Sequence, residues 1–313
     1  MTMNLKHLVR DCCARLLASV LERLALDPRY FELWQSHGFH VVPVHFYQPI
    51  PDTRLLCATQ WQRQTALVGI QLNETKQLDL LSLFATRYRE EYEKLPRDQI
   101  SEKYHFFLNN VNFSSVDAEL LFCMVRHFKP RRIVEIGSGS STLLAADALA
   151  RNHKEGFPGT MLAIEPFPRA FLRSDLPAQV ELLPQVVQNI PLKEFEALHE
   201  NDILFIDSSH VCKIGSDVQY EFLEILPRLA PGVLVHVHDI FLPVEYPESW
   251  LRKDLRFWNE QYLLQAFLCL NDCFEVLWAG HWLHLKHPDR LAKAFRSYGR
   301  DALPRSFWIR RVK

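Results

Sequence analysis

The chain has 313 residues, of which 48% are hydrophobic and 23% are charged, a composition typical of an ordinary globular protein. Its 36 basic and 37 acidic residues leave a net charge of -1. Such a balance produces no overall field that would attract nucleic acid or an anionic membrane, so neither is expected as a partner. The length fits one large domain or one domain with an appendage.

At the N-terminus, residues 1–26 place apolar side chains at helical spacing, among them Leu5, Leu16 and Leu24. Charged residues interrupt the stretch before it is long enough for a signal peptide or a membrane span. This pattern predicts an amphipathic helix that packs on the rest of the protein or on the second subunit of a homodimer.

Seven cysteines are scattered along the chain without a CxxC pair or a zinc-binding pattern: Cys12, Cys13, Cys57, Cys123, Cys212, Cys269 and Cys273. An odd, dispersed set is typical of reduced thiols in the cytoplasm, which is the expected location.

Helical patterns and one proline-rich segment make up the chain before residue 115. The segment HVVPVHFYQPIPDTRLL, residues 40–56, carries prolines that oppose a helix, whereas residues 75–95 have helical periodicity with charges outside. We expect residues 1–114 to form a mainly helical extension or lid, and residues 115–313 to form a separate domain.

Beyond residue 115, strand patterns alternate with helical patterns of ten or more residues. This order predicts an α/β fold, a Rossmann-like doubly wound and mostly parallel sheet with an antiparallel C-terminal edge hairpin. We expect helices over residues 115–128, 141–152, 192–200, 216–229 and 259–270, and strands over 132–137, 161–166, 180–185, 202–209, 232–241, 274–280 and 306–311.

A glycine loop follows the first of these strands, in the stretch VEIGSGSST at residues 134–142. Its glycines let a ligand approach the backbone at a helix start, but no Gly-Lys-Ser/Thr ending is present, and Thr142 stands where a dinucleotide loop needs a third glycine. Glu135 would repel a pyrophosphate and suits an ammonium or sulfonium group. Glu165 ends the next strand, where it can accept hydrogen bonds from ribose hydroxyls.

The motifs VEIGSGSST, AIEPFP, DILFIDSSH and GVLVHVHDIF, in this order, resemble those of class I S-adenosylmethionine-dependent methyltransferases over residues 115–313. More narrowly, they are similar to the macrocin O-methyltransferase and cephalosporin-hydroxylase-like branch of bacterial secondary metabolism. Ser141 replaces the third glycine of the family loop. The resemblance implies that S-adenosylmethionine is bound by Glu135, Gly137, Ser138, Gly139, Ser140, Ser141, Thr142, Glu165, Asp207, Ser208 and Ser209.

Polar residues gather at the ends of two strands that should be neighbours. His236 is expected to be buried and structural, whereas Asp207, His238 and Asp239 could hold a divalent metal ion. Metal-dependent members of the resembling branch have an acidic pair here, and His238 departs from it. The alternative is that His210 or His238 acts as the catalytic base.

Within the N-terminal extension, the most ligand-like residues are Tyr47, Asp52, Tyr104 and Asn109, which we expect to contact the substrate as part of a lid that excludes water. The alternative for each is an ordinary polar position in a loop or core.

Taken together, the residues and the resemblance predict methyl transfer to a small molecule, with oxygen favoured over nitrogen as the acceptor atom. A second reading is a cyclase that consumes the same cofactor, releasing methylthioadenosine and forming azetidine-2-carboxylate. A nicotinamide-dependent oxidoreductase and a non-catalytic binding protein are further alternatives, and the former is disfavoured by Glu135 and Thr142.

Overall fold

The structure is a computed structural model that describes residues 5–25, 27–99, 105–174, 176–299 and 301–313. By its internal contacts the chain divides into residues 1–60 and residues 61–313. Residues 61–114, which the sequence groups with the N-terminal extension, thus lie in the same unit as the sheet.

The N-terminal unit contains the predicted amphipathic helix, α1 (Leu5–Leu24), followed by α2 (Phe31–Ser36). Leu16 and Val20 of α1 are more than half exposed. Residues 40–56 form no helix, as their prolines predict, and α3 (Ala58–Gln62) crosses into the second unit. In the described part of the chain, no helix combines the length and hydropathy needed to span a membrane.

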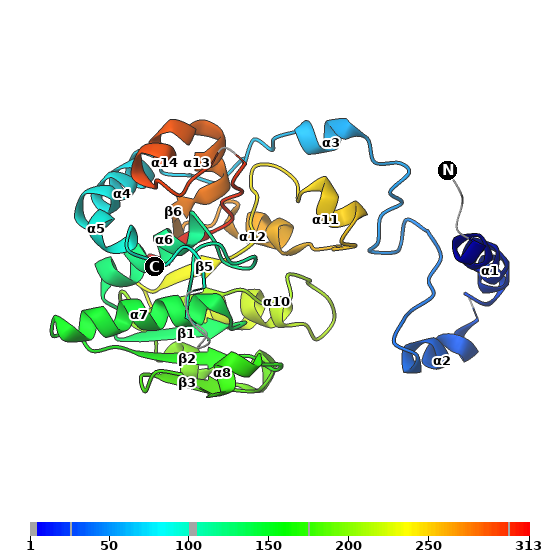
Figure 1. Cartoon of the computed structure of the whole chain (residues 1–313), viewed down its shortest axis with the longest axis horizontal. Helices are drawn as coiled ribbons and strands as arrows, with labels where there is room; N and C mark the ends of the chain where they lie inside the picture. Colours follow the sequence, from blue (N-terminus) through cyan, green and yellow to red (C-terminus); the bar gives the residue numbers. More distant parts are fainter. Residues whose placement is uncertain (1–4, 26, 100–104, 175, 300) are drawn as a thin grey trace. The chain divides into compact units, whose positions relative to one another are not determined.

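A seven-stranded sheet organises the second unit, in the order β3-β2-β1-β4-β5-β7-β6 (Figure 1). The first five strands run parallel, and β7 pairs antiparallel with both β5 and β6, which confirms the expected mostly parallel sheet with an antiparallel edge. The strands are β1 (Arg132–Ile136), β2 (Thr160–Ile164), β3 (Val180–Leu183), β4 (Ile203–Ile206), β5 (Leu234–Val237), β6 (Phe274–Ala279) and β7 (Phe307–Arg311).

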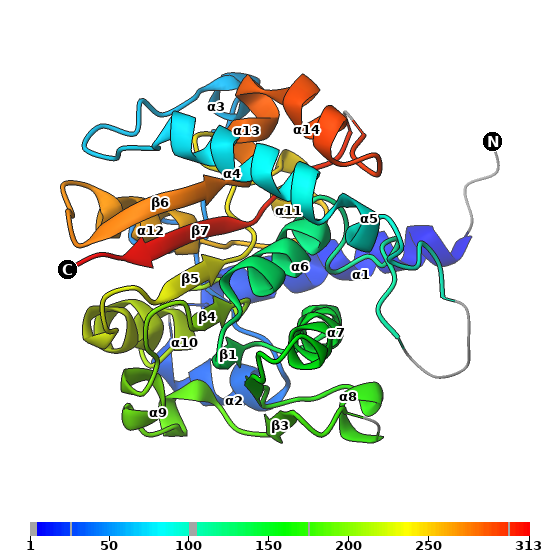
Figure 2. The same cartoon turned by 90° about the vertical axis from the view of Figure 1, so that its left-hand side faces the viewer.

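Both faces of the central strands are buried, which is why β4 reads as a continuous apolar run. Helices α6 and α7 cover one face, and α10 and α12 cover the other (Figure 2). The helices of this unit are α4 (Glu74–Arg87), α5 (Arg89–Tyr92), α6 (Asp117–Phe128), α7 (Ser140–Lys154), α8 (Ala170–Ser174), α9 (Lys193–Glu196), α10 (Asp217–Tyr220), α11 (Glu248–Arg252), α12 (Glu260–Leu268), α13 (Gly280–Lys286) and α14 (Pro288–Ala294).

The helices α4 and α5 are tied to the C-terminal part of the chain by hydrogen bonds. The hydroxyl of Tyr92 donates to the carbonyl of Ala294 at 2.7 Å, and the backbone N–H of Ala279 donates to Oε1 of buried Gln77 at 2.8 Å. These bonds hold α5 against α14 and α4 against β6.

The predicted helix over residues 216–229 is broken into three parts. After α10, residues Glu221–Ile225 form a π-helical turn and Leu226–Arg228 a 3-10 turn. Pro227, which lacks a backbone donor, lies in the last of these turns. The π-helical turn includes Glu221, whose carboxylate reaches the end of β4.

Candidate functional site

The glycine loop after β1 is pressed against the end of β4. Gly137 has a φ of +82°, and a Cβ there would lie 1.8 Å from the carbonyl oxygen of Asp207. Only glycine fits both the left-handed backbone and this approach. The loop and the end of β4 therefore form one continuous wall at the carboxyl edge of the sheet.

Glu135 lies beneath this loop, with 1% of its surface exposed. Its carboxylate oxygens accept from the hydroxyl of Ser141 at 2.7 Å and from that of Thr142 at 2.5 Å. Burial raises the pKa of Glu135 to about 8, despite these hydrogen bonds. The side chain thus ties β1 to the start of α7, and its contact with a ligand's amino group stays a prediction.

Glu165, at the end of β2, holds the same loop from the other side. One carboxylate oxygen accepts from the backbone N–H of Ser138 at 3.2 Å, and the other from that of Phe167 at 2.8 Å. Each oxygen keeps a further lone pair, so the carboxylate can also accept from a ligand.

A hollow of about 420 Å³, here called the strand-end hollow, opens at the carboxyl ends of β1, β2 and β4. Of the eleven residues that the sequence predicts as cofactor contacts, it is lined by Gly137, Glu165, Asp207, Ser208 and Ser209. The lining also includes residues that the sequence does not predict as cofactor contacts: Ile136, Ile164, Pro166, Phe167, Val186, Val187, Gln188, Lys213, Gly215, Ser216 and Asp217.

The remaining predicted contacts, Glu135, Ser138, Gly139, Ser140, Ser141 and Thr142, do not line this hollow. Ser140, Ser141 and Thr142 are buried at the start of α7. Thr142 accepts from the backbone N–H of Gly139 at 3.0 Å, which closes the first turn of that helix. The hydroxyls of Ser141 and Thr142 thus stabilise the loop and the start of α7.

The hydroxyls of Ser208 and Ser209 are already engaged with α10 and the turn that follows it. Ser208 donates to Glu221 at 3.1 Å, and Ser209 donates to Asp217 at 2.5 Å. These bonds fix the loop after β4, which leaves Asp207 as the acidic group at the end of that strand facing the hollow.

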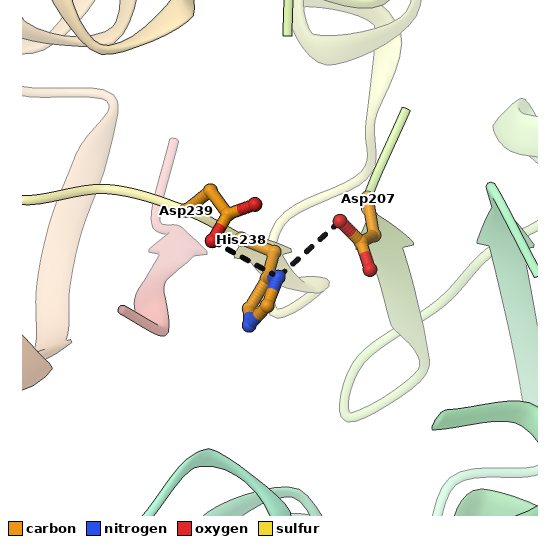
Figure 3. A group of neighbouring side chains, drawn as sticks. All are labelled: Asp207, His238 and Asp239. Atoms are coloured by element: carbon orange, nitrogen blue, oxygen red, sulfur yellow. Dashed lines mark hydrogen bonds and ion pairs between the residues drawn. The ribbon is translucent and has the colours of Figure 1, made fainter. Parts of the chain in front are cut away.

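Asp207, His238 and Asp239, the predicted metal ligands, lie together at the ends of β4 and β5 (Figure 3). Nδ1 of His238 is 3.2 Å from Oδ1 of Asp207 and 3.7 Å from Oδ1 of Asp239. One donor atom from each residue lies within 4.8 Å of the others. One imidazole nitrogen and two carboxylate oxygens are donors that suit a divalent cation.

His210 and His238 are both held among carboxylates. Nδ1 of His210 lies 2.8 Å from Oε2 of Glu260, and its Nε2 lies 3.4 Å from both Asp207 and Asp239. Burial alone would lower the pKa of His210, but its bonds to Asp207 and Glu260 raise it well above 6.5. For His238, burial is likewise outweighed by Asp207 and Asp239, which raise the pKa to about 10. Both imidazoles thus hold a proton more firmly than a free histidine does, and the role of either as the catalytic base stays a prediction.

His236 has the structural place that is expected inside a central strand covered on both faces. It is fully buried, its Nε2 lies 2.9 Å from the hydroxyl of Ser306, and its ring stacks on Phe205 with centroids 4.0 Å apart. Burial lowers the pKa of His236 well below 6.5, which keeps the ring neutral.

Two further residues complete the cluster, and no sequence motif marks either of them. Asp117, at the start of α6, lies 3.5 Å from Nε2 of His238 and accepts from the backbone N–H of Ser306 at 2.9 Å. Arg305 places Nη1 3.0 Å from Oδ1 of Asp239. We call Asp117, Asp207, His210, His238, Asp239, Glu260 and Arg305 the ionic cluster. Its members come from residues 117 to 305, so only the folded chain reveals it.

A second and larger hollow, of about 650 Å³, adjoins the ionic cluster through Arg305. We call it the arginine hollow, because Arg97, Arg256 and Arg305 all line it, together with Leu108, Asn109, Asn110, Val111, Ser114, Ser115, Trp250, Ser297, Asp301, Ala302 and Leu303.

The four predicted lid residues have separate places. Asn109 lines the arginine hollow, and its side-chain N–H donates to Asp98 at 2.8 Å. Tyr47 and Asp52 belong to the N-terminal unit, where Tyr47 is 81% exposed and Asp52 is paired with Arg54 at 2.7 Å. Tyr104 lies outside the described residues.

Comparison with known proteins agrees with the fold. Residues 134–240 match a family model described as a methyltransferase domain. An uncharacterized protein of Archaeoglobus fulgidus is 32% identical over 168 residues, which cover 51% of this chain and 75% of that protein.

Solved structures give weaker likenesses. CmcI-N160 with SAH is 16% identical, covering 72% of this chain and 91% of its own, with a TM-score of 0.37. The O-methyltransferase from Bacillus cereus in complex with SAH is 15% identical, covering 76% and 90%, with a TM-score of 0.38. From the family model, the archaeal relative and the strand order, the chain belongs to the class I S-adenosylmethionine-dependent methyltransferase superfamily.

Proposed function

We propose that this protein transfers the methyl group of S-adenosylmethionine to an oxygen atom of a small molecule. The observation that carries the proposal is the strand-end hollow, which is walled by Gly137 and Glu165 and reaches the ionic cluster at Asp207. Ligands of open α/β sheets bind at this edge, outside the carboxyl ends of the strands.

The residues of the hollow fit the cofactor. Its volume of about 420 Å³ lies within the usual range for small-molecule sites. Glu165 offers oxygens to ribose hydroxyls, while Ile164, Phe167 and Val187 offer apolar surface to an adenine ring. When bound, S-adenosylmethionine supplies a methyl group on a positively charged sulfur.

Asp207 is the group best placed to orient an attacking hydroxyl. It lines the hollow and keeps 27% of its side chain exposed, whereas His238 and Asp239 are almost fully buried. Burial would raise the pKa of Asp207, but His238 and His210 hold it well below 3.8, so the group stays a carboxylate. In the reaction a methyl–oxygen bond forms, the methyl–sulfur bond breaks to release S-adenosylhomocysteine, and the carboxylate of Asp207 accepts the hydroxyl proton.

The donor set of Asp207, His238 and Asp239 fits a divalent cation, which at this place would lower the pKa of a bound hydroxyl. We propose that turnover needs such an ion. Treatment with EDTA should lower the rate at least tenfold, and Mg²⁺ or Mn²⁺ should restore it. An unchanged rate after EDTA, with no metal left by elemental analysis, would make the cluster an ion-pair network alone.

Product analysis tests the function itself. The protein is incubated with S-adenosylmethionine and a panel of hydroxylated small molecules, and the adenosyl product is identified by mass spectrometry. S-adenosylhomocysteine that forms only with an acceptor supports methyl transfer. Methylthioadenosine that forms without an acceptor would instead establish the cyclase. Asp207→Asn should slow methyl transfer about a hundredfold or more while S-adenosylhomocysteine still binds.

A further inference from the structure

We propose that the arginine hollow is the acceptor site and that it selects acceptors carrying an oxyanion, a carboxylate or a phosphate, besides the hydroxyl to be methylated. This inference rests on the proposed function, and it names the substrate class of the same site. It is carried by the charge of the hollow, its polar lining and its connection to the ionic cluster.

The charge of the hollow is unbalanced. Among the described residues that line it, three are arginines and one, Asp301, is an acid. Arg305 is largely neutralised, because its guanidinium contacts Asp239 at 3.0 Å and donates to the carbonyl of Asn112 at 3.2 Å. Arg97 and Arg256 remain as the cations that a ligand would meet.

The side chain of Arg256 is held in place by its neighbours. Its guanidinium lies 4.6 Å from the ring centroid of Trp250 and 5.0 Å from that of Trp258, and its Nε is 3.6 Å from the exposed carboxylate of Asp254. A planar guanidinium fixed on aromatic rings keeps its fork of N–H donors available for a carboxylate or phosphate.

Part of the remaining lining is polar. Asn109, Ser114, Ser115 and Ser297 contribute amide and hydroxyl groups, and the hydroxyls of Ser115 and Ser297 lie 2.7 Å apart. Hydroxyl and amide groups of this kind can exchange hydrogen bonds with the hydroxyls of a ligand. The lining therefore suits a hydroxylated, anionic molecule.

Arg305 belongs both to the lining of the arginine hollow and to the ionic cluster. Its contact with Asp239 joins the arginine hollow to the ionic cluster, and Asp207 joins the cluster to the strand-end hollow. An acceptor in the arginine hollow can thus direct its hydroxyl towards the cluster while its oxyanion meets Arg97 and Arg256. The guanidiniums then set which molecule is held, and the cluster sets which oxygen reacts.

The first experiment measures binding and needs no knowledge of the natural acceptor. Trp250 lines the hollow, so its fluorescence reports on a ligand there. Benzoate, phenyl phosphate and uncharged benzyl alcohol are titrated into the protein saturated with S-adenosylhomocysteine, at constant ionic strength. We expect at least one anion to bind about tenfold or more tightly than benzyl alcohol, and the better one identifies the oxyanion.

Variants locate that preference. Arg97→Gln combined with Arg256→Gln should abolish it, whereas Arg256→Lys should keep part of it. Arg252→Gln is the matched control, because Arg252 lies on α11 outside the hollow and pairs with Glu248 at 2.7 Å. Equal affinity for the three probes, or an anion preference that survives in the double variant, overturns the proposal.

Turnover separates this inference from the proposed function. Hydroxylated acceptors are compared in pairs with and without a carboxylate, by formation of S-adenosylhomocysteine. A preference for the carboxylated member that falls at least tenfold in the double variant supports the inference. Methylation that ignores the carboxylate overturns it and leaves methyl transfer intact, whereas methylthioadenosine as the only product overturns the proposed function.

Discussion

Gly137 lies so close to the backbone of Asp207 that any side chain at this position would collide with it. A Cβ there would lie 1.8 Å from Asp207 O, so Gly137→Ala must push the glycine loop away from β4. We expect the variant to lose at least tenfold in affinity for S-adenosylhomocysteine, measured by calorimetry.

Gly156→Ala is the control for the backbone alone. Gly156 also has a positive φ, +88°, but a Cβ there meets nothing within 4 Å. This variant should lose about 1 kcal/mol of stability and keep its affinity. Equal affinities in the two variants would mean that the loop does not shape the site.

Glu135 makes stability depend on pH. The folded protein keeps this carboxyl protonated up to its pKa of about 8, whereas the unfolded chain releases the proton near 4.5. The folded state therefore binds more protons between these values, and stability falls as pH rises through that window, by up to about 1.4 kcal/mol per pH unit. Urea unfolding of Glu135→Gln at pH 5, 6.5 and 8 should show a flatter profile than the wild type. Parallel profiles would contradict the raised pKa.

The sequence predicts the site residues that lie at strand ends, but not those that only a long-range contact brings to the site. Gly137, Glu165, Asp207 and His238 sit at strand ends, whose place follows from the alternation of strands and helices. Arg305 has no such signal, because its role comes from a contact with Asp239, 66 positions away, that depends on how β7 enters the sheet.

At the level of elements, Asp117 joins the start of α6 to the start of β7. Its carboxylate accepts from the backbone N–H groups of Arg305 and Ser306, and it lies 3.5 Å from His238. Asp117→Asn removes a buried charge that faces two cations, so we expect a loss of about 2–4 kcal/mol in urea unfolding.

Asp147→Asn is the matched surface control. Asp147 pairs with Arg151 one helical turn away on α7, at 3.2 Å, and its side chain is 47% exposed. Its replacement should change stability by no more than about 0.5 kcal/mol. A comparable loss in both variants would show that Asp117 has no special place between α6 and β7.

The elements themselves were largely predictable, because buried parallel strands are apolar runs and their helices carry a 3.6-residue period. All seven expected strands are present, and the helices over residues 115–128 and 141–152 are confirmed as α6 and α7. The π-helical turn at Glu221–Ile225 was not predicted, and the contact of Glu221 with Ser208 joins residues that only the folded chain brings together.

For the whole molecule, the division at residue 60 bears on the lid that the sequence predicts. The segment around Phe46 and Tyr47 is strongly exposed within its own unit, at 82% and 81%. We expect chymotrypsin to cut the intact protein there first, and S-adenosylhomocysteine to slow this cleavage if the segment covers the bound cofactor. Fragment masses over time give the rates, with cleavage after Leu270, 85% exposed in the other unit, as the internal reference. A cleavage rate that S-adenosylhomocysteine does not change would show that this segment does not cover the bound cofactor.

The position of β7 has a consequence for how the protein is made. The strand lies between β5 and β6 although its residues, 307–311, follow both of them in the chain. While those residues are still inside the ribosome, the edges of β5 and β6 have no partner and are open to pairing with other chains. A chain that is cut before residue 307 would thus keep β5 and β6 but lack the strand that joins them.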